Sequence, residues 1–285
     1  MKLALVGASG VVGRKILQIL EKKNITFEEF YPLGSSTVGE IITFHGIEYT
    51  IQDPSSFDAS STDVAILAAG SIAAKTYAHQ YVNAGNYVID LSSEYRYEDD
   101  VPLVIPEING AELAELNEPS LISNPNCSTS QLLMVLDSIH QAFNIDIINI
   151  ATYQAVSGTG KKAVQELQTQ SNQTDSEISP EIYPKPIAFN VIPQCDIFLE
   201  NDFTKEEMKL VWETNKILDP SISVQATCAR VPVFNGHSEA VFFRVEQKTS
   251  KEEIIELLTQ YKGVKVVDNP ANLEYPTPRE YANDT

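Results

Sequence analysis

Basic residues are scarce in this chain of 285 residues. Its 20 lysines and arginines are outnumbered by 39 acidic residues, which gives a formal net charge of −19 at pH 7. So strong a negative charge argues against nucleic acid or an anionic membrane as a partner, because both repel an acidic protein. An anionic ligand must therefore be held by cationic side chains placed in its own site.

Cysteine is rare as well, and the three cysteines at positions 127, 195 and 228 fit neither a disulfide framework nor a zinc cluster. This pattern indicates a reducing compartment and a protein without a metal site. No apolar run approaches the length of a membrane span. The N-terminal run Lys2–Val6 is too short for the hydrophobic segment of a signal peptide. These absences predict a cytoplasmic protein.

Strand-like and helix-like patterns alternate in the first part of the chain. Buried strands are predicted near Leu3–Val6, Asp63–Leu67 and Tyr87–Asp90, and Ile72–Ala84 has helical periodicity. Such alternation predicts a right-handed parallel sheet. After Cys127 the pattern changes to longer loops and paired strands, which indicates a second domain built on another sheet.

A glycine-rich turn follows the first predicted strand, with the spacing GxxGxxG from Gly7 to Gly13. Gly7 and Gly10 would let the backbone approach a pyrophosphate at a helix N-terminus, and Gly13 would let that helix pack close to its strand. A simple tight turn is the alternative, but the position directly after the strand favours a dinucleotide site. The predicted contacts of this turn are Gly7, Ala8, Ser9, Gly10, Val11 and Val12.

The tip of the second predicted strand, residues 34–39, carries no acidic residue. NAD-selective folds usually place one there for the ribose diol. Three hydroxyl side chains could instead accept a 2′-phosphate, which favours NADP, although a plain hydrophilic loop is the alternative. Ligands collect at the carboxyl ends of parallel strands, so the next strand tip should line the same crevice. The predicted contacts are Ser35, Ser36, Thr37, Ala69 and Gly70.

Length and pattern together define the expected fold. A chain of 285 residues exceeds the usual size of a single core and suggests two domains. We expect an α/β fold in which a Rossmann-like, doubly wound NADP-binding domain occupies residues 1–125. An α+β substrate domain should occupy residues 126–285, and the family resemblance given below implies that it is also the catalytic and dimerisation domain.

A polar octet, residues 124–131, lies between two apolar segments and contains Cys127. Ser128, Thr129 or Ser130 could cap the helix that follows, and the positive end of that helix would favour a thiolate at Cys127. The thiolate is the nucleophilic form of cysteine. The alternative is that Cys127 is a small buried residue, as most free cysteines are.

These motifs together resemble the aspartate-β-semialdehyde dehydrogenase family, part of a broad group with N-acetyl-γ-glutamyl-phosphate reductase and glyceraldehyde-phosphate dehydrogenase. The motif NPNCST separates this family from the acetylglutamyl-phosphate reductases, whose cysteine motif resembles NPGC followed by Tyr. The motifs that carry the resemblance are GASGVVG at 7–13, SSEYR ending at Arg96, IPEIN at 105–109, NPNCSTSQ at 124–131, TYQAVSGTG at 152–160, KEEMK at 205–209, and ARVPV with GHSEA at 229–240.

The resemblance implies an NADP-dependent homodimeric oxidoreductase of the aspartate-derived pathway to lysine (through diaminopimelate), threonine and methionine. It would reversibly reduce β-aspartyl phosphate to aspartate semialdehyde and phosphate through a thioester on Cys127. His237 matches the family's acid/base residue, and Gln154 matches the residue that orients the acyl group. A satisfied strand-end histidine and a buried structural amide are the alternatives. Ser157 and Gly158 match cofactor contacts.

The implied substrate has two anionic ends, which need cations. Arg230 matches the residue that grips the α-carboxylate, where a guanidinium can bond in bidentate fashion. Glu206 and Lys209 stand three apart on a predicted helix, and a surface ion pair is the default interpretation of that spacing. By resemblance, Glu206 would meet the α-ammonium group. Lys209 would hold the phosphate together with Arg96 and Asn126.

The chain departs from the family pattern in two places. Many members carry an arginine for the 2′-phosphate in the loop that corresponds to residues 34–39, and this loop has none, so the choice between NADP and NAD stays open. The family also continues beyond the position of Thr285 into a strand and a closing helix. Unless a longer natural chain or a dimer partner covers the surface that this segment would bury, we expect weak NADP binding and either self-association through the uncovered face or poor turnover.

Two alternatives from other classes stay open. A malonyl-CoA reductase also uses an NPNC-type cysteine, but Glu206 and Arg230 disfavour it because a CoA thioester has no α-amino-acid group. A truncated, non-catalytic dinucleotide-binding homologue is the other. The presence of Gln154 and His237 beside these residues argues against loss of activity.

Overall fold

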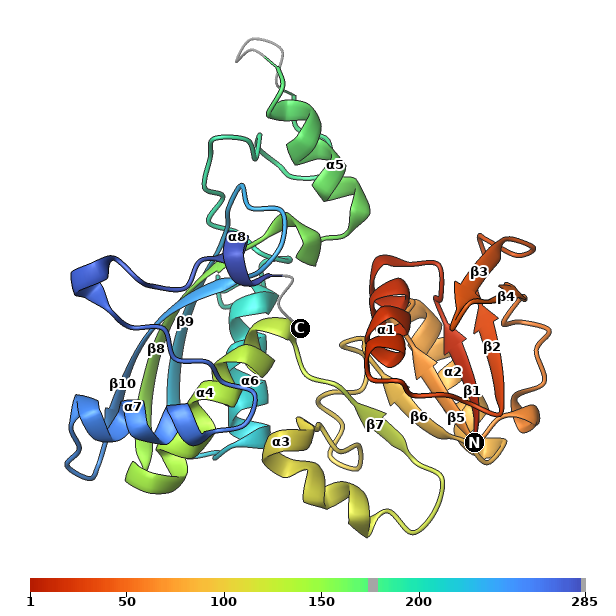
Figure 1. The fold of residues 1–285 in the computed structure, drawn as a ribbon, viewed down its shortest axis with the longest axis horizontal. Coiled ribbons are helices and arrows are strands. Elements are labelled where there is room, and N and C mark those ends of the chain that lie inside the picture. Colours follow the sequence, from red (N-terminus) through yellow and green to blue (C-terminus); the bar gives the residue numbers. More distant parts are fainter. Residues whose placement is uncertain (174–178, 283–285) are drawn as a thin grey trace. The chain divides into compact units, whose positions relative to one another are not determined.

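The computed structural model describes residues 1–173 and 179–282. The chain forms two compact units, Met1–Pro125 (unit 1) and Asn126–Thr285 (unit 2) (Figure 1). Each unit has its own main sheet, and the two main sheets differ in strand direction; unit 1 also contains a separate two-stranded antiparallel sheet.

Unit 1 is built on a five-stranded sheet with the order β2-β1-β5-β6-β7, in which every pairing is parallel. The strand order reverses between β1 and β5, where crevices for ligands form in such sheets. The elements of unit 1 are β1 (Lys2–Val6), α1 (Val11–Lys22), β2 (Glu29–Leu33), β3 (Ile41–Phe44), β4 (Ile47–Thr50), η1 (Ala59–Ser61), β5 (Val64–Leu67), α2 (Ser71–Asn83), β6 (Tyr87–Asp90), α3 (Pro106–Asn109), η2 (Gly110–Glu115) and β7 (Leu121–Ser123).

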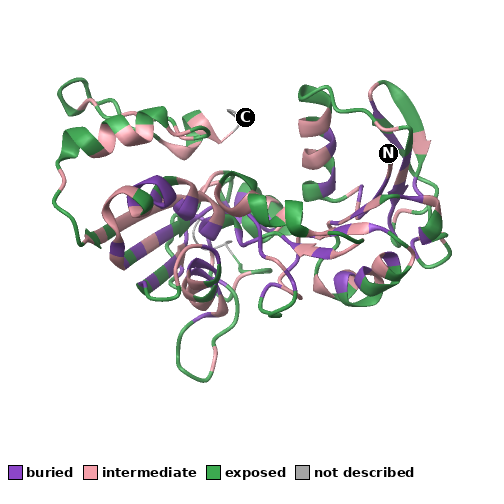
Figure 2. Ribbon diagram, turned by 90° about the horizontal axis from the view of Figure 1, so that it is seen from below, coloured by how far each residue is buried: buried purple, intermediate pink, exposed green. Residues whose placement is uncertain are grey.

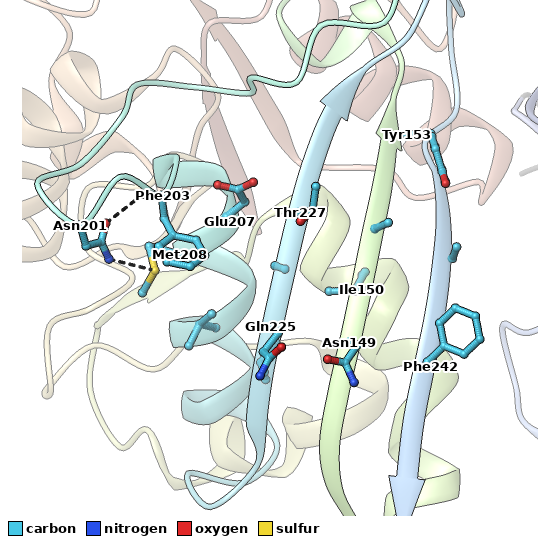
Figure 3. Close-up of a pocket in the computed structure, with 15 residues that line it drawn as sticks. Asn149, Ile150, Tyr153, Asn201, Phe203, Glu207, Met208, Gln225, Thr227 and Phe242 are labelled. Carbon is cyan, nitrogen blue, oxygen red and sulfur yellow. Dashed lines mark hydrogen bonds between the residues drawn. The ribbon is translucent and has the colours of Figure 1, made fainter.

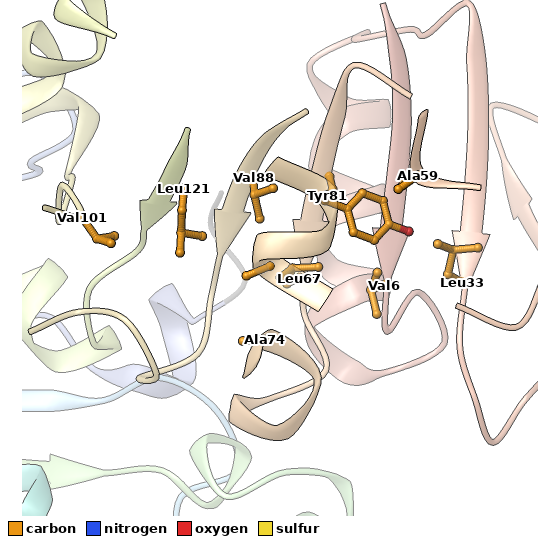
Figure 4. Close-up of a cluster of buried hydrophobic side chains, with 12 residues drawn as sticks. Val6, Leu33, Ala59, Leu67, Ala74, Tyr81, Val88, Val101 and Leu121 are labelled. Carbon is orange, nitrogen blue, oxygen red and sulfur yellow. The ribbon is translucent and has the colours of Figure 1, made fainter. Parts of the chain in front are cut away.

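Both faces of the unit 1 sheet are buried. Successive side chains of a strand point to opposite faces, and in β1 Leu3 and Leu5 join one apolar cluster whereas Ala4 and Val6 join another. The second cluster also contains Tyr81 of α2 (Figure 4). Burial on both faces explains why these strands read as continuous apolar runs, and it confirms the predicted α/β doubly wound fold.

Unit 2 is built on a three-stranded mixed sheet with the order β10-β8-β9. The central strand β8 runs parallel to β9 and antiparallel to β10. The elements of unit 2 are α4 (Cys127–Phe143), β8 (Ile145–Gln154), η3 (Val156–Gly158), α5 (Lys161–Gln170), α6 (Lys205–Ile217), β9 (Ser223–Arg230), β10 (Ser238–Val245), α7 (Lys251–Gln260), η4 (Pro270–Asn272) and α8 (Pro278–Tyr281).

Burial alternates along the strands of this second sheet (Figure 2). In β9, Ala226, Cys228 and Arg230 are buried, whereas their neighbours are half-buried or exposed. Helices α4 and α6 pack against the buried side. The mixed sheet with helices on one face confirms the predicted α+β character of the second part of the chain.

The structure corrects the predicted start of the helix that carries Cys127. The helix was expected to be capped by Ser128, Thr129 or Ser130, but it begins at Cys127 and its cap is Asn126. The Asn126 side-chain oxygen accepts hydrogen bonds from the N–H groups of Ser128 at 2.8 Å and Thr129 at 3.4 Å. An asparagine caps as well as a hydroxyl residue does, so the two were interchangeable by propensity alone.

Within the described residues, no helix combines the length and apolarity needed to cross a bilayer.

Candidate active site

The accessible thiol of the chain is that of Cys127. As the first residue of α4 it is exposed, whereas Cys195 and Cys228 are buried. Burial raises the pKa of Cys195 to about 11 and that of Cys228 to about 12, so both are protonated near neutral pH. The positive end of α4, by contrast, favours an anion at the position of Cys127. Cys127 is therefore the candidate nucleophile on grounds of exposure and position.

A row of buried charges on α6 lies against the cap of α4. Glu206, Lys209 and Glu213 are spaced at i, i+3 and i+7, hence on one helix face, and all three are buried. The Asn126 side-chain nitrogen donates to Glu206 Oε1 at 3.0 Å, and the Asn126 backbone N–H donates to Glu213 Oε2 at 2.6 Å. Two carboxylates of one helix thus fix the residue that precedes Cys127.

Glu206 and Lys209 form a buried ion pair, not the surface pair that their spacing suggests by default. Lys209 Nζ lies 2.9 Å from Glu206 Oε2 and 2.8 Å from Asp196 Oδ2. Burial opposes the charge on Glu206, but Lys209 and hydrogen bonds from Gln154 and Asn126 lower its pKa overall. Burial likewise opposes the charge on Lys209, and its two carboxylate partners raise its pKa. Both side chains are therefore charged at neutral pH.

Gln154 ends β8 and joins the same network. Its side-chain nitrogen lies 3.0 Å from Glu206 Oε1, 3.2 Å from Ser128 Oγ and 3.3 Å from Thr152 Oγ1. The amide plane is thereby oriented by acceptors on α4, α6 and its own strand. Gln154, Asn126 and Lys209 all form hydrogen bonds with Glu206, so these four predicted site residues lie together.

Arg230 and His237 meet beside Ala155, the residue after β8. Arg230 is paired in register with Gln154, and its Nη1 donates to the Ala155 carbonyl at 2.8 Å. The Ala155 N–H donates to His237 Nδ1 at 2.9 Å. Burial, with Arg230 as a second cause, lowers the pKa of His237 to about 4 against an opposing effect of Glu206. His237 is therefore neutral at physiological pH.

Sheet topology explains why these side chains converge. Strands β8 and β9 are parallel, so Gln154 and Arg230 stand at the same edge of the sheet. Strand β10 is antiparallel to β8 and starts at that edge, immediately after His237. Strand ends and helix starts therefore supply the candidate site at one end of unit 2.

Gly158, predicted as a cofactor contact with Ser157, lies in η3 next to this cluster. A Cβ atom at position 158 would lie 3.1 Å from His237 Cε1 and 3.2 Å from Arg230 Nη1. Glycine is thus the residue that leaves the imidazole and the guanidinium room to meet.

The predicted nucleotide contacts of unit 1 lie at the carboxyl ends of β1, β2 and β5. Gly7 adopts φ +88°, and a Cβ atom on Gly13 would lie 2.3 Å from the Gly7 carbonyl oxygen, so both positions need glycine. Ser9 Oγ lies 2.9 Å from Thr37 Oγ1, which joins the glycine turn to the second strand tip. Gly70, three residues after β5, is the N-cap residue of α2.

The remaining predicted contacts show the same organisation. Val11 and Val12 are exposed at the start of α1, and Ala8 is buried beneath them. Ser35, Ser36, Ala69 and Gly70 are exposed. Arg96, predicted to hold phosphate, is a buried residue of unit 1 whose Nη2 donates to the Leu91 carbonyl at 3.4 Å. Its phosphate role stays a prediction.

Two residues of the cluster escaped the sequence-based prediction. Glu213 lies seven residues after Glu206, so helical spacing could have placed it on the same face. Asp196 lies in a loop with φ +68° and has no periodic pattern that would reveal it. Across the described residues, no group of three or more His, Cys, Asp or Glu side chains is arranged to hold a metal ion.

Comparison with known proteins identifies the family. Residues 2–116 match the model of the semialdehyde dehydrogenase NAD binding domain, and residues 136–285 match that of the semialdehyde dehydrogenase dimerisation domain. The aspartate-semialdehyde dehydrogenase of Legionella pneumophila is 44% identical over 97% of this chain and 81% of its own length. The chain belongs to the aspartate-semialdehyde dehydrogenase family. The resemblance predicted from the motifs is confirmed.

Other members of this family agree. The aspartate-semialdehyde dehydrogenase of Bacillus subtilis is 40% identical over 98% of this chain and 84% of its own length. The crystal structure of aspartate semialdehyde dehydrogenase II from Vibrio cholerae complexed with ASA superposes with a TM-score of 0.93 at 39% identity, covering 97% of this chain and 82% of that one. Membership in the family identifies the chain as an oxidoreductase with an NAD-binding domain.

Proposed function

We propose that this protein catalyses the reversible, NADP-dependent reduction of β-aspartyl phosphate to aspartate semialdehyde and phosphate, with Cys127 as the nucleophile. The observation that carries the proposal is the convergence, at one edge of the unit 2 sheet, of an exposed thiol with a buried arginine, an ion-paired glutamate and an oriented amide. This set matches a small substrate that has an acyl carbon at one end and an α-amino-acid group at the other.

In the reductive direction, the Cys127 thiolate attacks the acyl carbon of β-aspartyl phosphate. A carbon–sulfur bond forms, the carbon–oxygen bond to phosphate breaks, and phosphate leaves with the electron pair. The thioester that results keeps the acyl carbon activated, and after its reduction the carbon–sulfur bond breaks and Cys127 returns as thiolate. Bound NADPH would supply the hydride for that reduction.

The substrate's amino-acid group meets two side chains of opposite charge. Arg230 offers a planar guanidinium to the α-carboxylate, and its Nε is buried without a hydrogen-bond partner in the described structure. Glu206 offers its carboxylate to the α-ammonium group, since a carboxylate can accept more bonds than the three it holds here. Lys209 and Asn126 are the proposed phosphate contacts of unit 2.

A malonyl-CoA reductase activity is a weaker candidate. Malonyl-CoA has a carboxylate that Arg230 could bind, but it has no ammonium group to face the buried Glu206. The charge of Glu206 would then be buried without a function in binding.

The glycine turn of unit 1 fits the pyrophosphate of a dinucleotide. It stands at the start of α1, where Gly10 is the cap residue and offers no side chain to bond the first N–H groups. Beside it, the strand tip with Ser35, Ser36 and Thr37 has hydroxyl groups and no carboxylate, which supports NADP as the cofactor. The aspartate semialdehyde dehydrogenase of Candida albicans, which shares the fold at 24% identity and a TM-score of 0.67, was solved with NADP.

We further propose a homodimer that forms through the uncovered face of the unit 2 sheet. This face lines a cavity of about 770 Å³ with Tyr153 and Phe242, and Phe203 lines it from the loop before α6 (Figure 3). The three aromatic side chains are exposed by 45%, 76% and 47%, respectively. Exposed aromatic side chains around a hollow are typical of an association surface. The matching family model describes a dimerisation domain over the same residues.

The dimer is tested by the mass of the protein in solution. We expect Phe242→Arg to yield a monomer, whereas Ile72→Arg, at a residue 86% exposed on α2, should leave the mass unchanged. A Phe242→Arg protein with the mass of a dimer would move the association surface elsewhere.

We also propose that the protein works in the cytoplasm, because an exposed nucleophilic thiol is preserved in a reducing compartment.

The activity itself is tested by phosphate-dependent reduction of NADP with aspartate semialdehyde as substrate. We expect turnover that requires both phosphate and Cys127, with malonyl semialdehyde and CoA as the comparison pair. Turnover with the CoA pair alone would favour a malonyl-CoA reductase. Nucleotide binding without turnover of either pair would favour a non-catalytic homologue.

A further inference from the structure

Arg14 is a cation at a place in its own helix that disfavours one. It is an exposed residue near the start of α1, where the helix dipole has its positive end. The first turn of α1 has no acidic residue, and Arg14 forms no ion pair with any described residue. A positive side chain in this place is stabilised when an anion is bound beside it.

The hydrogen bonds of this region place the guanidinium group beside the tip of β2. Arg14 Nε donates to the Ser9 carbonyl at 3.0 Å, and Nη1 and Nη2 have no partner among the described residues. The Ser9 side chain in turn bonds to Thr37 Oγ1 at 2.9 Å. Arg14 is therefore attached to the residue that joins the glycine turn to residues 34–39.

The tip of β2 has the polar groups that bind a phosphate, but it has no charge of its own. Ser35 and Ser36 are exposed, Thr37 is half-buried, and residues 34–39 include no acidic and no basic side chain. Hydroxyl groups donate to phosphate oxygens, and a cation makes such binding much stronger. In a protein with a net charge of −19, that cation has to be a neighbouring side chain.

The other basic residues of unit 1 are poorly placed to supply it. One begins β1 at the amino edge of the sheet, two stand at the far end of α1, one lies on α2, which follows β5 and not β2, and one is buried after β6. In the same order, these residues are Lys2, Lys22, Lys23, Lys75 and Arg96. Lys15, the neighbour of Arg14, forms no bond with the glycine turn in the described structure.

We propose that Arg14 binds the 2′-phosphate of NADP, with Ser35 and Ser36 as hydroxyl partners, and that it thereby determines the preference for NADP over NAD. The inference rests on the proposed function, because it names the residue that recognises the proposed cofactor. The bond to Ser9 holds Nε and leaves the planar Nη pair to donate to phosphate oxygens. NAD has a hydroxyl group in place of this phosphate, so it gains nothing from the charge.

The direct test is the affinity of Arg14→Gln for NADP and for NAD, two molecules that differ only in the 2′-phosphate. Isothermal titration calorimetry measures both without any turnover. We expect the substitution to weaken NADP binding roughly ten- to a hundredfold, the effect of losing a charge-assisted bond, and to leave NAD binding unchanged. An unchanged affinity for NADP would overturn the proposal, and so would equal affinities of the unmodified protein for the two nucleotides.

Equal losses for both nucleotides would also overturn it, because they would place Arg14 at the pyrophosphate or give it a structural role in the turn. The stability of the protein without nucleotide supplies a separate readout. Arg14→Gln should unfold at the same temperature as the unmodified protein or at a higher one, since a cation leaves the positive end of α1. A lower unfolding temperature together with equal losses would mean that the bond to Ser9 merely supports the turn.

Two further variants separate the charge from its position. Lys22→Gln removes a positive charge from the last turn of the same helix and should leave the ratio of the two affinities unchanged. In Arg14→Lys one ammonium group has to serve both the Ser9 carbonyl and the phosphate, so part of the preference for NADP should remain. A preference as low as that of Arg14→Gln would contradict a role for the charge.

Failure of this inference and failure of the proposed reaction give different results. A protein that prefers NADP through Arg14 but does not turn over aspartate semialdehyde would refute the reaction and keep the inference. A protein that turns over aspartate semialdehyde and keeps its preference for NADP in Arg14→Gln would do the reverse.

Discussion

The two candidate sites in this chain are built from different materials. The nucleotide edge of unit 1 consists largely of main chain. Its segments pack so closely at Gly7 and Gly13 that a side chain at either position would collide with neighbouring backbone atoms. The substrate edge of unit 2 consists of buried charged side chains, each held by a partner of opposite charge or by hydrogen bonds. A site of the first kind should fail when atoms are added, and a site of the second kind when a partner is removed or its geometry changed.

The largest effect is expected at the nucleophile, where unit 2 should lose its chemistry and unit 1 should keep its ligand. Cys127→Ser should lower kcat by about 10⁴-fold or more, because a hydroxyl is a far weaker nucleophile than a thiolate. NADP affinity, measured by fluorescence titration, should stay the same. In the unmodified chain, mass-spectrometric mapping should find iodoacetamide on Cys127 before Cys195 or Cys228, and the reverse order would discredit the assignment.

Adding one methyl group should break the nucleotide edge. In Gly13→Ala the new Cβ would lie 2.3 Å from the Gly7 carbonyl oxygen, so α1 must move away from β1. We expect a loss of about 3 kcal/mol in the free energy of unfolding together with weakened NADP binding. Gly110→Ala is the matched control, since its Cβ would meet nothing closer than 3.7 Å. Similar denaturation curves for the two variants would refute the packing argument.

The substrate edge is tested by replacing a guanidinium group with an ammonium group, which keeps the positive charge and changes the arrangement of the donors. Arg230→Lys should lower kcat/KM for aspartate semialdehyde roughly ten- to a hundredfold, because lysine lacks the planar pair of donors. Steady-state kinetics would measure this, with Arg244→Lys on the exposed part of β10 as the control. If the loss appeared in NADP binding and not in substrate use, Arg230 would belong to the cofactor site.

Glu239 is the exception among the charges of unit 2. Its Oε1 is buried without a hydrogen-bond partner in the described structure, and burial raises its pKa to about 8. A carboxyl whose pKa is raised in the folded state stabilises the fold below its unfolded pKa, and this stability is lost as the pH rises through about 8.

Glu239→Gln should therefore stabilise the protein by on the order of 1 to 2 kcal/mol at about pH 8 and have little effect at about pH 4. Urea denaturation at the two pH values measures the difference, and Glu256→Gln, at an exposed residue of α7, is the control. A gain that did not depend on pH would mean that the carboxyl is already satisfied.

The sequence predicted the two sites unequally, for a physical reason. The glycine turn is a local feature, so its spacing after a buried strand was sufficient to predict the strand–turn–helix unit that the structure shows, and its role as a nucleotide site stays a prediction. The buried pair of Glu206 and Lys209 was visible as a helical spacing, but spacing alone cannot distinguish a buried face from an exposed one.

The parts of the substrate edge that were missed depend on tertiary contacts. Asp196 reaches Lys209 from a loop, and the Asn126 backbone finds Glu213 at a distance of 87 residues in the sequence. The cap at Asn126 was missed because several neighbouring residues have similar capping propensity. The backbone N–H of Ala155, which donates to His237, could not be predicted from the sequence, because every residue except proline has a backbone N–H group.

The bonds that surround Cys127 join residues far apart in the chain: Asn126 pairs with Glu206 and Glu213 at separations of 80 and 87 residues, and Ala155 with His237 at 82. During synthesis at about 5 to 20 residues per second, Cys127 is therefore made roughly 4 to 17 s before Glu213, the α6 residue that accepts the hydrogen bond of the Asn126 backbone. For that interval the thiol is part of an unfinished nascent chain. Because the finished fold also leaves Cys127 exposed, its thiol should need reductant during translation and afterwards alike.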